Sequence, residues 1–139
     1  MTGEYSCMLD AKGRAAIPVK YRAELGNVVY VCKGVGQSLF VYSEASWRGI
    51  EEKLAALPIS QARQLQLTLF PSAIRFELDA QGRVLLSQKL REYAGLTREI
   101  VVLGAGNRAE IWSEPVWRQF EAEKLTPESM LEAMDLLSY

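Results

Sequence analysis

The chain of 139 residues contains nearly the same pentapeptide twice. DAKGR occupies residues 10–14 and DAQGR occupies residues 79–83, so the copies are 69 positions apart, close to half the length of the chain. The same offset aligns further identical residues, namely Lys20 with Lys89, Arg22 with Arg91, and Gly26 with Gly95. Identity that recurs at a fixed period is the signature of a duplicated architecture. We therefore expect the fold to consist of two equivalent units.

One extra residue in the second copy changes the offset to 70 and carries the match toward the end of each unit. SEASWR at residues 43–48 then aligns with SEPVWR at residues 113–118. Units much shorter than ~70 residues rarely bury enough apolar surface to fold alone. We therefore predict a first repeat of residues 1–70 and a second of residues 71–139, which share one core around a pseudo-two-fold axis.

A strand and a tight turn are expected to open each unit. Apolar residues alternate with others over residues 5–9 and 74–78, which indicates strands with one buried face. Asp at the first position and Gly at the fourth position of each pentapeptide favour a type I turn closed by a left-handed glycine. Strand is expected to resume after the Arg, in AAI and in VLL, so that each unit would begin with a hairpin.

Helices and a strand pair are expected after each hairpin. Two strands joined by a glycine-containing turn are predicted in VVYVCKGVGQSLFVY and in IVVLGAGNRAEIWS. Ser43 and Ser113 are suited to cap helices that carry Trp47 and Trp117, which we interpret as core anchors rather than base-stacking platforms. The other predicted helices cover residues 18–25, 60–70, 88–94 and 126–137, with Pro71 after the second of them and Thr126 capping the last.

Histidine is absent from the sequence, and this excludes several kinds of chemistry. Neither a Ser-His nor a Cys-His nucleophile pair can form, and no imidazole is present to bind a metal or transfer a proton. Cys7 and Cys32 lack CxxC spacing, so reduced structural thiols are favoured over a disulfide or a metal site. Each acidic residue has a helix, turn or surface explanation. We therefore predict that the protein is not an enzyme and has no catalytic residues, metal, cofactor or small-molecule substrate.

The sequence shows no sign of export or membrane insertion. Its first ten residues lack the cationic and apolar segments of a secretory signal, and its apolar runs are far shorter than the ~20 residues of a membrane-spanning helix. The expected location is the cytoplasm, without a membrane partner. The net charge of −1 combines a mildly basic body, +3 over residues 1–120, with an acidic end, −4 from residue 121. This distribution permits nucleic-acid binding by the body without requiring it.

Three basic positions recur in register in the two units, and they are the candidate binding residues. They are Arg14, Lys20 and Arg22 in the first unit and Arg83, Lys89 and Arg91 in the second. Turn formation explains the Asp and Gly of the pentapeptide, but it does not require an Arg directly after the Gly. A solvated helix face would also retain Lys and Arg, so a binding role and a merely solvated surface both stay open.

Four segments resemble the MraZ family of bacterial proteins: GEY at residues 3–5, DAKGRAAIPVKYR at 10–22, DAQGR at 79–83 and EIW at 110–112. The second of these is also similar to the broader AbrB class of swapped-hairpin transcription factors. The resemblance covers nearly the whole chain. It implies an α+β fold, a swapped-hairpin (AbrB/MraZ-like) β-barrel formed by two tandem repeats within one chain, with flanking helices. Each half would contribute an interleaved hairpin, as two separate chains do in AbrB-like dimers.

The resemblance also implies a function. MraZ proteins look like ring-shaped homo-oligomers that act as DNA-binding transcriptional regulators of the division and cell-wall gene cluster. They recognise short repeats in double-stranded promoter DNA, so the protein would be associated with the bacterial nucleoid. The family's DNA-contacting role falls on Lys12, Arg14 and Arg83 of this chain. The AbrB-like helix arginine falls on Arg22, with Arg91 as its internal equivalent.

The chain departs from the family pattern at Gln81, where Lys would be more typical. We therefore expect the second turn to bind DNA less strongly than the first. The alternative function is a homo-oligomeric assembly or protein-interaction module without specific DNA binding, in which the basic sites only join protomers. Strong salt-dependent DNA binding by the purified protein would separate the two.

Overall fold

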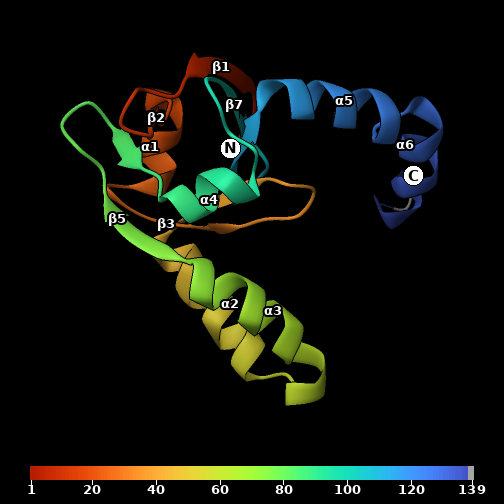
Figure 1. Cartoon of the computed structure of the whole chain (residues 1–139). Helices are drawn as coiled ribbons and strands as arrows, with labels where there is room; N and C mark the ends of the chain where they lie inside the picture. The colour runs from red at the N-terminus through yellow and green to blue at the C-terminus, as the bar shows by residue number, and fades with distance from the viewer. Residues whose placement is uncertain (138–139) are drawn as a thin grey trace.

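In the computed structural model, which describes residues 1–137, eight strands and six α-helices follow one another in an order that repeats once (Figure 1). The strands are β1 (Glu4–Met8), β2 (Arg14–Ala16), β3 (Val28–Lys33), β4 (Leu39–Ser43), β5 (Ile74–Glu77), β6 (Arg83–Leu85), β7 (Glu99–Gly104) and β8 (Ala109–Ser113). The helices are α1 (Val19–Leu25), α2 (Glu44–Ala55), α3 (Ile59–Ser72), α4 (Gln88–Tyr93), α5 (Glu114–Lys124), α6 (Pro127–Ala133) and the 3-10 helix η1 (Met134–Leu137). Residues 138 and 139, the end of the predicted second repeat, lie outside the described residues.

The turn of each pentapeptide forms as predicted. The backbone N–H of Gly13 donates to the carbonyl of Asp10 at 3.0 Å, and that of Gly82 donates to the carbonyl of Asp79 at 2.9 Å. The φ angles of Gly13 and Gly82 are 86° and 73°, values at which a Cβ atom would be strained. We call residues 10–13 turn 1 and residues 79–82 turn 2. The strand that follows each turn begins at the Arg itself, one residue earlier than expected.

The strands on the two sides of each turn do not form a ladder with each other. Instead β1 pairs antiparallel with β7, β5 pairs with β3, and β2 pairs with β6, so each of these strands lies beside a strand of the other repeat. The prediction that the two strands of each hairpin pair with each other is therefore wrong. Alternation of apolar residues requires a strand with one buried face, but it does not specify the neighbouring strand.

The fold is mixed α+β with antiparallel sheets, as predicted. The order in the six-stranded sheet is β1-β7-β8-β4-β3-β5, and the same order results when the two repeats are exchanged. β2 and β6 form a separate two-stranded sheet. The six-stranded sheet ends in β1 and β5 and is not closed, so its hydrogen bonding does not describe a complete barrel.

Both repeats contribute to one central core. The short β2–β6 ladder buries Ala15 and Val84 completely, together with Tyr21 and Leu90 from the helices that follow the two strands. Two smaller clusters lie beside this core, one around Trp47 and one around Trp117, whose side chains are 4% and 9% exposed. The interpretation of the two tryptophans as core anchors is confirmed.

Most predicted helices are present, with differences at their ends. Ser43 caps α2 by accepting a hydrogen bond from the N–H of Ser46, and Thr126 caps α6 in a reciprocal pair with Ser129. Ser113 makes no such bond at α5, where a proline in the first turn removes one donor. Residues 134–137 of the helix predicted over 126–137 tighten into η1.

The helix predicted to end before Pro71 instead continues to Ser72. Pro71 lies in the last turn, where it removes one backbone N–H donor and is followed by a single helical residue. The hydroxyl of Ser72 donates to the carbonyls of Thr68 and Leu69, at 2.9 and 3.0 Å, and this supports the last turn. The tendency of proline to end a helix was therefore not decisive here, where the Ser72 hydroxyl bonds to carbonyls of the last turn.

Candidate nucleic-acid interface

Arg14 and Arg83 share the outer face of the β2–β6 ladder. In its register Arg14 lies opposite Leu85, and Ala16 lies opposite Arg83. Because side chains alternate along a strand, these four residues point away from the buried Ala15–Val84 pair. The side chains of Arg14 and Arg83 are 29% and 28% exposed. The two arginines thus lie on one surface, and neither is inside the core.

Asp10 holds both turn 1 and the arginine that follows it. Its carboxylate accepts hydrogen bonds from the N–H groups of Lys12 and Arg14, at 3.0 and 2.8 Å, and from Nε of Arg14 at 2.6 Å. The pKa of Asp10 is lowered mainly by the backbone N–H of Arg14, with further contributions from the Arg14 guanidinium and the N–H of Lys12. The Nη groups of Arg14 donate no hydrogen bond within residues 1–137, so one edge of the guanidinium is available.

Turn 2 repeats this arrangement with one change. Asp79 accepts from the N–H groups of Gln81 and Arg83, both at 2.9 Å, and from Nε of Arg83 at 2.8 Å. However, Nη2 of Arg83 donates to Oε1 of Gln81 at 3.2 Å, and Nη1 lies 3.7 Å from Oδ2 of Asp10. The guanidinium of Arg83 is therefore more engaged within the protein than that of Arg14. Gln81 and Lys12 are both exposed at the tips of the turns.

Asp79→Asn is expected to lower the melting temperature by a few degrees at neutral pH and to have little effect well below pH 3.8. The N–H of Arg83 is the main cause of the lowered pKa of Asp79. A carboxyl whose pKa is lowered by folding adds stability above its unfolded pKa of ~3.9 and loses that contribution as the pH falls through the folded value. Thermal unfolding followed by circular dichroism from pH 2.5 to 7 measures the difference from wild type. A difference independent of pH would contradict the expectation.

Arg22 and Arg91 do not lie on the outer ladder face with the other candidates. Each is half-buried on its helix, with Nε donating to a carbonyl of its own repeat, Ile17 at 2.8 Å and Leu86 at 3.2 Å. Nη2 of Arg22 also donates to the carbonyl of Gln81, at 2.9 Å. The guanidinium of Arg91 lies against Gly13 of turn 1, so all five predicted site residues gather around the two turns. Lys20 and Lys89 are exposed on the same helices.

The sequence prediction omitted the apolar part of the ladder face. Ala16 is exposed, and Leu85 is 43% exposed although it is a large apolar side chain. Each lies two residues after an arginine of its own strand and therefore on the same face as that arginine, and the pairing of β2 with β6 brings the two strands together. The signal was absent from the sequence because it depends on that pairing.

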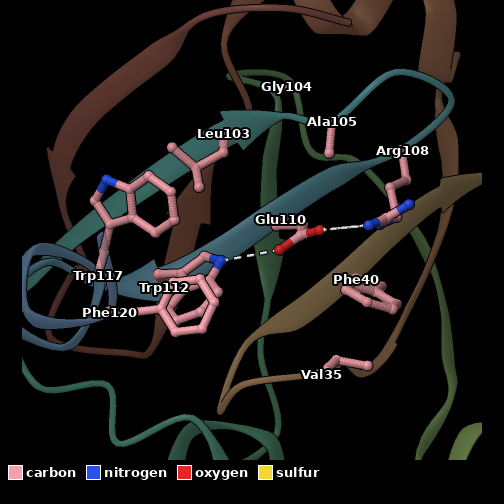
Figure 2. Close-up of a pocket in the computed structure, with 10 residues that line it drawn as sticks. All are labelled: Val35, Phe40, Leu103, Gly104, Ala105, Arg108, Glu110, Trp112, Trp117 and Phe120. Carbon is pink, nitrogen blue, oxygen red and sulfur yellow. Dashed lines mark hydrogen bonds and ion pairs between the residues drawn. The ribbon is translucent and has the colours of Figure 1, made fainter. Parts of the chain in front are cut away.

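A pocket of about 380 Å³ lies elsewhere, between α5, β8 and the loop that contains Val35 (Figure 2). Its one carboxylate, Glu110, accepts hydrogen bonds from Nε1 of Trp112 at 3.0 Å and from Nη2 of Arg108 at 2.8 Å. Figure 2 shows this carboxylate held between the two donors. The remaining lining is apolar, so the pocket offers no evident nucleophile or base. Its lining residues are Val35, Phe40, Leu103, Gly104, Ala105, Arg108, Glu110, Trp112, Trp117 and Phe120.

Other reactive groups are few in the described part of the chain. Cys7 and Cys32 are both free, and burial raises the pKa of the Cys32 thiol to about 12. Residues 1–137 contain no group of three His, Cys, Asp or Glu side chains placed to hold a metal ion. No helix in the same residues has the length and apolar character needed to cross a bilayer. The strongest candidate site is therefore the outer face of the β2–β6 ladder, with Arg14, Ala16, Arg83 and Leu85, which we call the ladder face.

Comparison with known proteins identifies the family. The family described as "MraZ protein, putative antitoxin-like" matches residues 1–68 and again residues 69–137. A protein of Carboxydothermus hydrogenoformans named transcriptional regulator MraZ is 48% identical over 120 residues, which cover 85% of this chain and 84% of that protein. Its namesake in Caldicellulosiruptor saccharolyticus is 41% identical over 140 residues, 99% of this chain and 98% of the relative. The chain belongs to the MraZ family.

Proposed function

We propose that the protein is a sequence-specific DNA-binding transcriptional regulator that acts at promoter repeats of the division and cell-wall gene cluster. Its relatives are named transcriptional regulators, and the MraZ family is not an enzyme class. The observation that carries the proposal is the placement of Arg14 and Arg83 on one outer face. Such a protein would work in the cytoplasm, in association with the nucleoid.

The ladder face supplies the groups that base and phosphate recognition require. An arginine whose Nη edge is available can bind O6 and N7 of guanine in the major groove, or a phosphate, in a bidentate manner. Asp10 supports this role for Arg14, because it binds Nε and leaves the Nη groups without a hydrogen-bond partner among the described residues. Lys12 is exposed at the tip of turn 1 and is suited to neutralise phosphate. Arg22 and Arg91, on the flanking helices, complete the proposed set of residues on which DNA binding depends.

A swapped-hairpin barrel is the architecture that we propose for the paired repeats. It is supported by the three strand pairs that join the repeats, β1–β7, β5–β3 and β2–β6. In this interpretation residues 1–70 and 71–139 act as one domain with an internal pseudo-two-fold axis. The benefit for DNA binding is that one polypeptide presents two equivalent turns side by side.

A homo-oligomeric ring is the proposed assembly, and it is supported by two different apolar helix surfaces. Figure 1 shows the α2–α3 pair and the α5–α6 pair leaving the sheet in different directions. α3 exposes Ile59, Leu65 and Leu67, and its one charged residue is basic. α6 and η1 expose Met130, Leu131 and Leu136, and their charged residues are all acidic. Two complementary surfaces on one chain favour head-to-tail contacts, which form a ring when the rotation between protomers closes and an open filament when it does not.

Leu131→Asp is expected to convert the oligomer into smaller species, because it places a charge in the apolar α6 surface, which is acidic already. Leu65→Asp on α3 should have the same effect, since it would alter the other half of the same contact. Sedimentation velocity measures the change in mass. Val19→Asp is the control, because Val19 is 73% exposed but lies on α1, away from both surfaces. Unchanged mass in both test variants would contradict the proposed contact.

Oligomerisation also accounts for how a protomer of net charge −1 could bind DNA with useful affinity. Each neutralised phosphate adds only ~0.9 to the salt slope of binding, so few contacts per protomer give weak attachment. When several ladder faces of one assembly meet successive DNA repeats, the later contacts benefit from an effective concentration that is roughly millimolar. Repetition in the protein would thus match repetition in the promoter.

The proposed function is tested with the purified protein and a duplex from the region upstream of its own gene. We expect binding that is stronger than to a shuffled duplex and that weakens steeply as salt is raised. Fluorescence anisotropy at several salt concentrations measures both properties. Equal, weak binding to both duplexes, with the oligomer intact, would favour the alternative function of an assembly or protein-interaction module.

A further inference from the structure

The guanidinium of Arg22 lies directly against turn 2, in the other repeat. Its Nη2 donates to the carbonyl of Gln81 at 2.9 Å, while Nε is held by the carbonyl of Ile17. A Cβ atom built on Gly82 would come within 3 Å of Cζ, Nε and Nη2 of Arg22. The guanidinium therefore occupies the space that a side chain at position 82 would need.

Arg91 lies against turn 1 in the reverse direction, less closely than Arg22 lies against turn 2 and without a hydrogen bond to turn 1 among the described residues. A Cβ atom on Gly13 of turn 1 would lie 2.8 Å from both Cζ and Nε of Arg91. Nε of Arg91 donates to the carbonyl of Leu86, and the N–H of Leu86 donates to the carbonyl of Gly13 at 3.0 Å. Each helix arginine thus covers the turn glycine of the opposite repeat. Gly13 and Gly82 are buried although they belong to surface turns.

Two requirements of the turn glycines are therefore distinct. The positive φ angle requires a residue that tolerates the left-handed region. The guanidinium group packed against the turn requires a residue without a side chain, because it occupies the space of a Cβ atom. Only glycine meets both. A turn that served merely to reverse the chain would need the first property and not the second, since asparagine also tolerates positive φ.

From this geometry we infer that Arg22 and Arg91 are positioning residues, each of which fixes the DNA-contacting turn of the opposite repeat. This inference rests on the proposed function of the ladder face. Arg22 holds turn 2 and thereby orients Arg83, and Arg91 holds turn 1 and thereby orients Arg14. The helix of one repeat controls the binding turn of the other, so the two turns act as one unit.

Paired substitutions test the crossed arrangement through DNA affinity. If Arg22 acts through turn 2, the loss caused by Arg22→Ala is expected to be largely absent in a chain that already carries Arg83→Ala, and to persist in full beside Arg14→Ala. Arg91→Ala should show the opposite pattern, with its loss absent beside Arg14→Ala. Multiplicative losses in all four pairs would overturn the inference and would favour direct DNA contact by the helix arginines.

A variant that preserves the charge separates a positioning role of Arg22 from a direct contact with phosphate. Arg22→Lys retains the positive charge but lacks the planar group that bonds to two carbonyls and covers Gly82. We expect it to bind DNA as weakly as Arg22→Ala, with an unchanged salt slope. Arg48→Ala is the control, because Arg48 is an exposed arginine on α2 that is paired with Glu44 and is not among the candidate binding residues. A salt slope reduced by ~0.9 in Arg22→Ala and restored in Arg22→Lys would identify a phosphate contact instead.

Hydrogen exchange in the DNA-free protein separates failure of this inference from failure of the proposed function. Arg22→Ala is expected to speed exchange of the amides of Gln81, Gly82 and Arg83 by about tenfold, the effect of losing roughly one hydrogen bond. The amides of turn 1 should keep their wild-type rates. Arg91→Ala should speed exchange in turn 1 and not in turn 2, by less than tenfold because Arg91 packs on Gly13 without donating a hydrogen bond to turn 1. Equal acceleration in both turns, or in neither, would overturn the crossed arrangement even if DNA binding is found. The expected pattern would support it even if no DNA is bound.

Discussion

Replacing Arg14 with alanine is expected to weaken binding to promoter DNA by about 5- to 150-fold per contacted repeat, the effect of losing one bidentate arginine–base pair. Arg14 follows a rigid turn, and Asp10 binds its Nε at 2.6 Å while leaving the Nη groups available. The substitution also leaves the Asp10 carboxylate facing DNA without its guanidinium partner, which adds repulsion. Electrophoretic mobility shift at fixed salt, with DNA from upstream of the gene, measures the loss.

Two further substitutions make this experiment specific. Arg48→Ala is the matched control, because Arg48 is exposed on α2 and is paired with Glu44, far in the sequence from both turns. Arg83→Ala is expected to cause a smaller loss than Arg14→Ala, since the guanidinium of Arg83 is already bonded to Gln81 and lies near Asp10. Wild-type binding by Arg14→Ala would refute its assignment as the strongest contact.

A fragment of residues 1–73, which contains the first repeat through α3, is expected not to fold as a monomer. It would lose the five-residue pairing of β1 with β7 and the pairing of β2 with β6. The core faces of Ala15, Tyr21 and Val29 would lose the apolar side chains that the second repeat packs against them. Burying a large apolar side chain stabilises a fold by roughly 1.5–3 kcal/mol. The loss of several such side chains together would therefore exceed the total stability of a typical small domain.

Folding of this fragment is expected only as a dimer, in which a second copy supplies the missing strands. Circular dichroism and sedimentation equilibrium over a range of concentrations measure folding and mass together, with the whole chain as the control. Helical and strand signals should appear only at concentrations at which dimers form. Cooperative unfolding of a monomeric fragment would contradict the expectation, because it would mean that the strand exchange is not needed for stability.

Local features of the fold were predictable from the sequence because their interactions span few residues. Asp10 bonds to groups two and four positions later, and Ser43 and Thr126 bond to N–H groups three positions later. The errors, at Ser113 and Pro71, arose where a neighbouring residue altered the helix end. Residue type therefore predicts a local motif well when no tertiary contact or neighbouring proline competes with it.

Strand pairing could not be predicted from the residues themselves. Alternation over residues 5–9 is the same whether the strand pairs with its neighbour in the chain or with β7. Only the resemblance to a swapped-hairpin family indicated that the hairpins interleave. The local ladder was a reasonable expectation because short connections usually join paired strands, and it was wrong because the other repeat offers the pairing edges and the apolar faces of a shared core.

The candidate site was predictable as a set of residues but not as an arrangement. Recurrence at an offset of 69 identified Arg14, Arg22, Arg83 and Arg91, and the family resemblance added Lys12. Their contact with DNA remains a prediction. What the sequence did not indicate is that Arg22 and Arg91 each lie on the turn of the opposite repeat.

The sequence by itself determined the duplication, the two glycine turns, most helix caps and the arginine that follows each turn. These depend on backbone preferences and on hydrogen bonds within a few residues, which residue type controls directly. The tertiary structure alone decided which strands pair, that Arg14 and Arg83 share one face, and that an arginine from each helix lies against the turn of the other repeat. Those outcomes depend on packing the apolar faces of the two repeats into one core, and this packing brings together residues that are far apart in the chain.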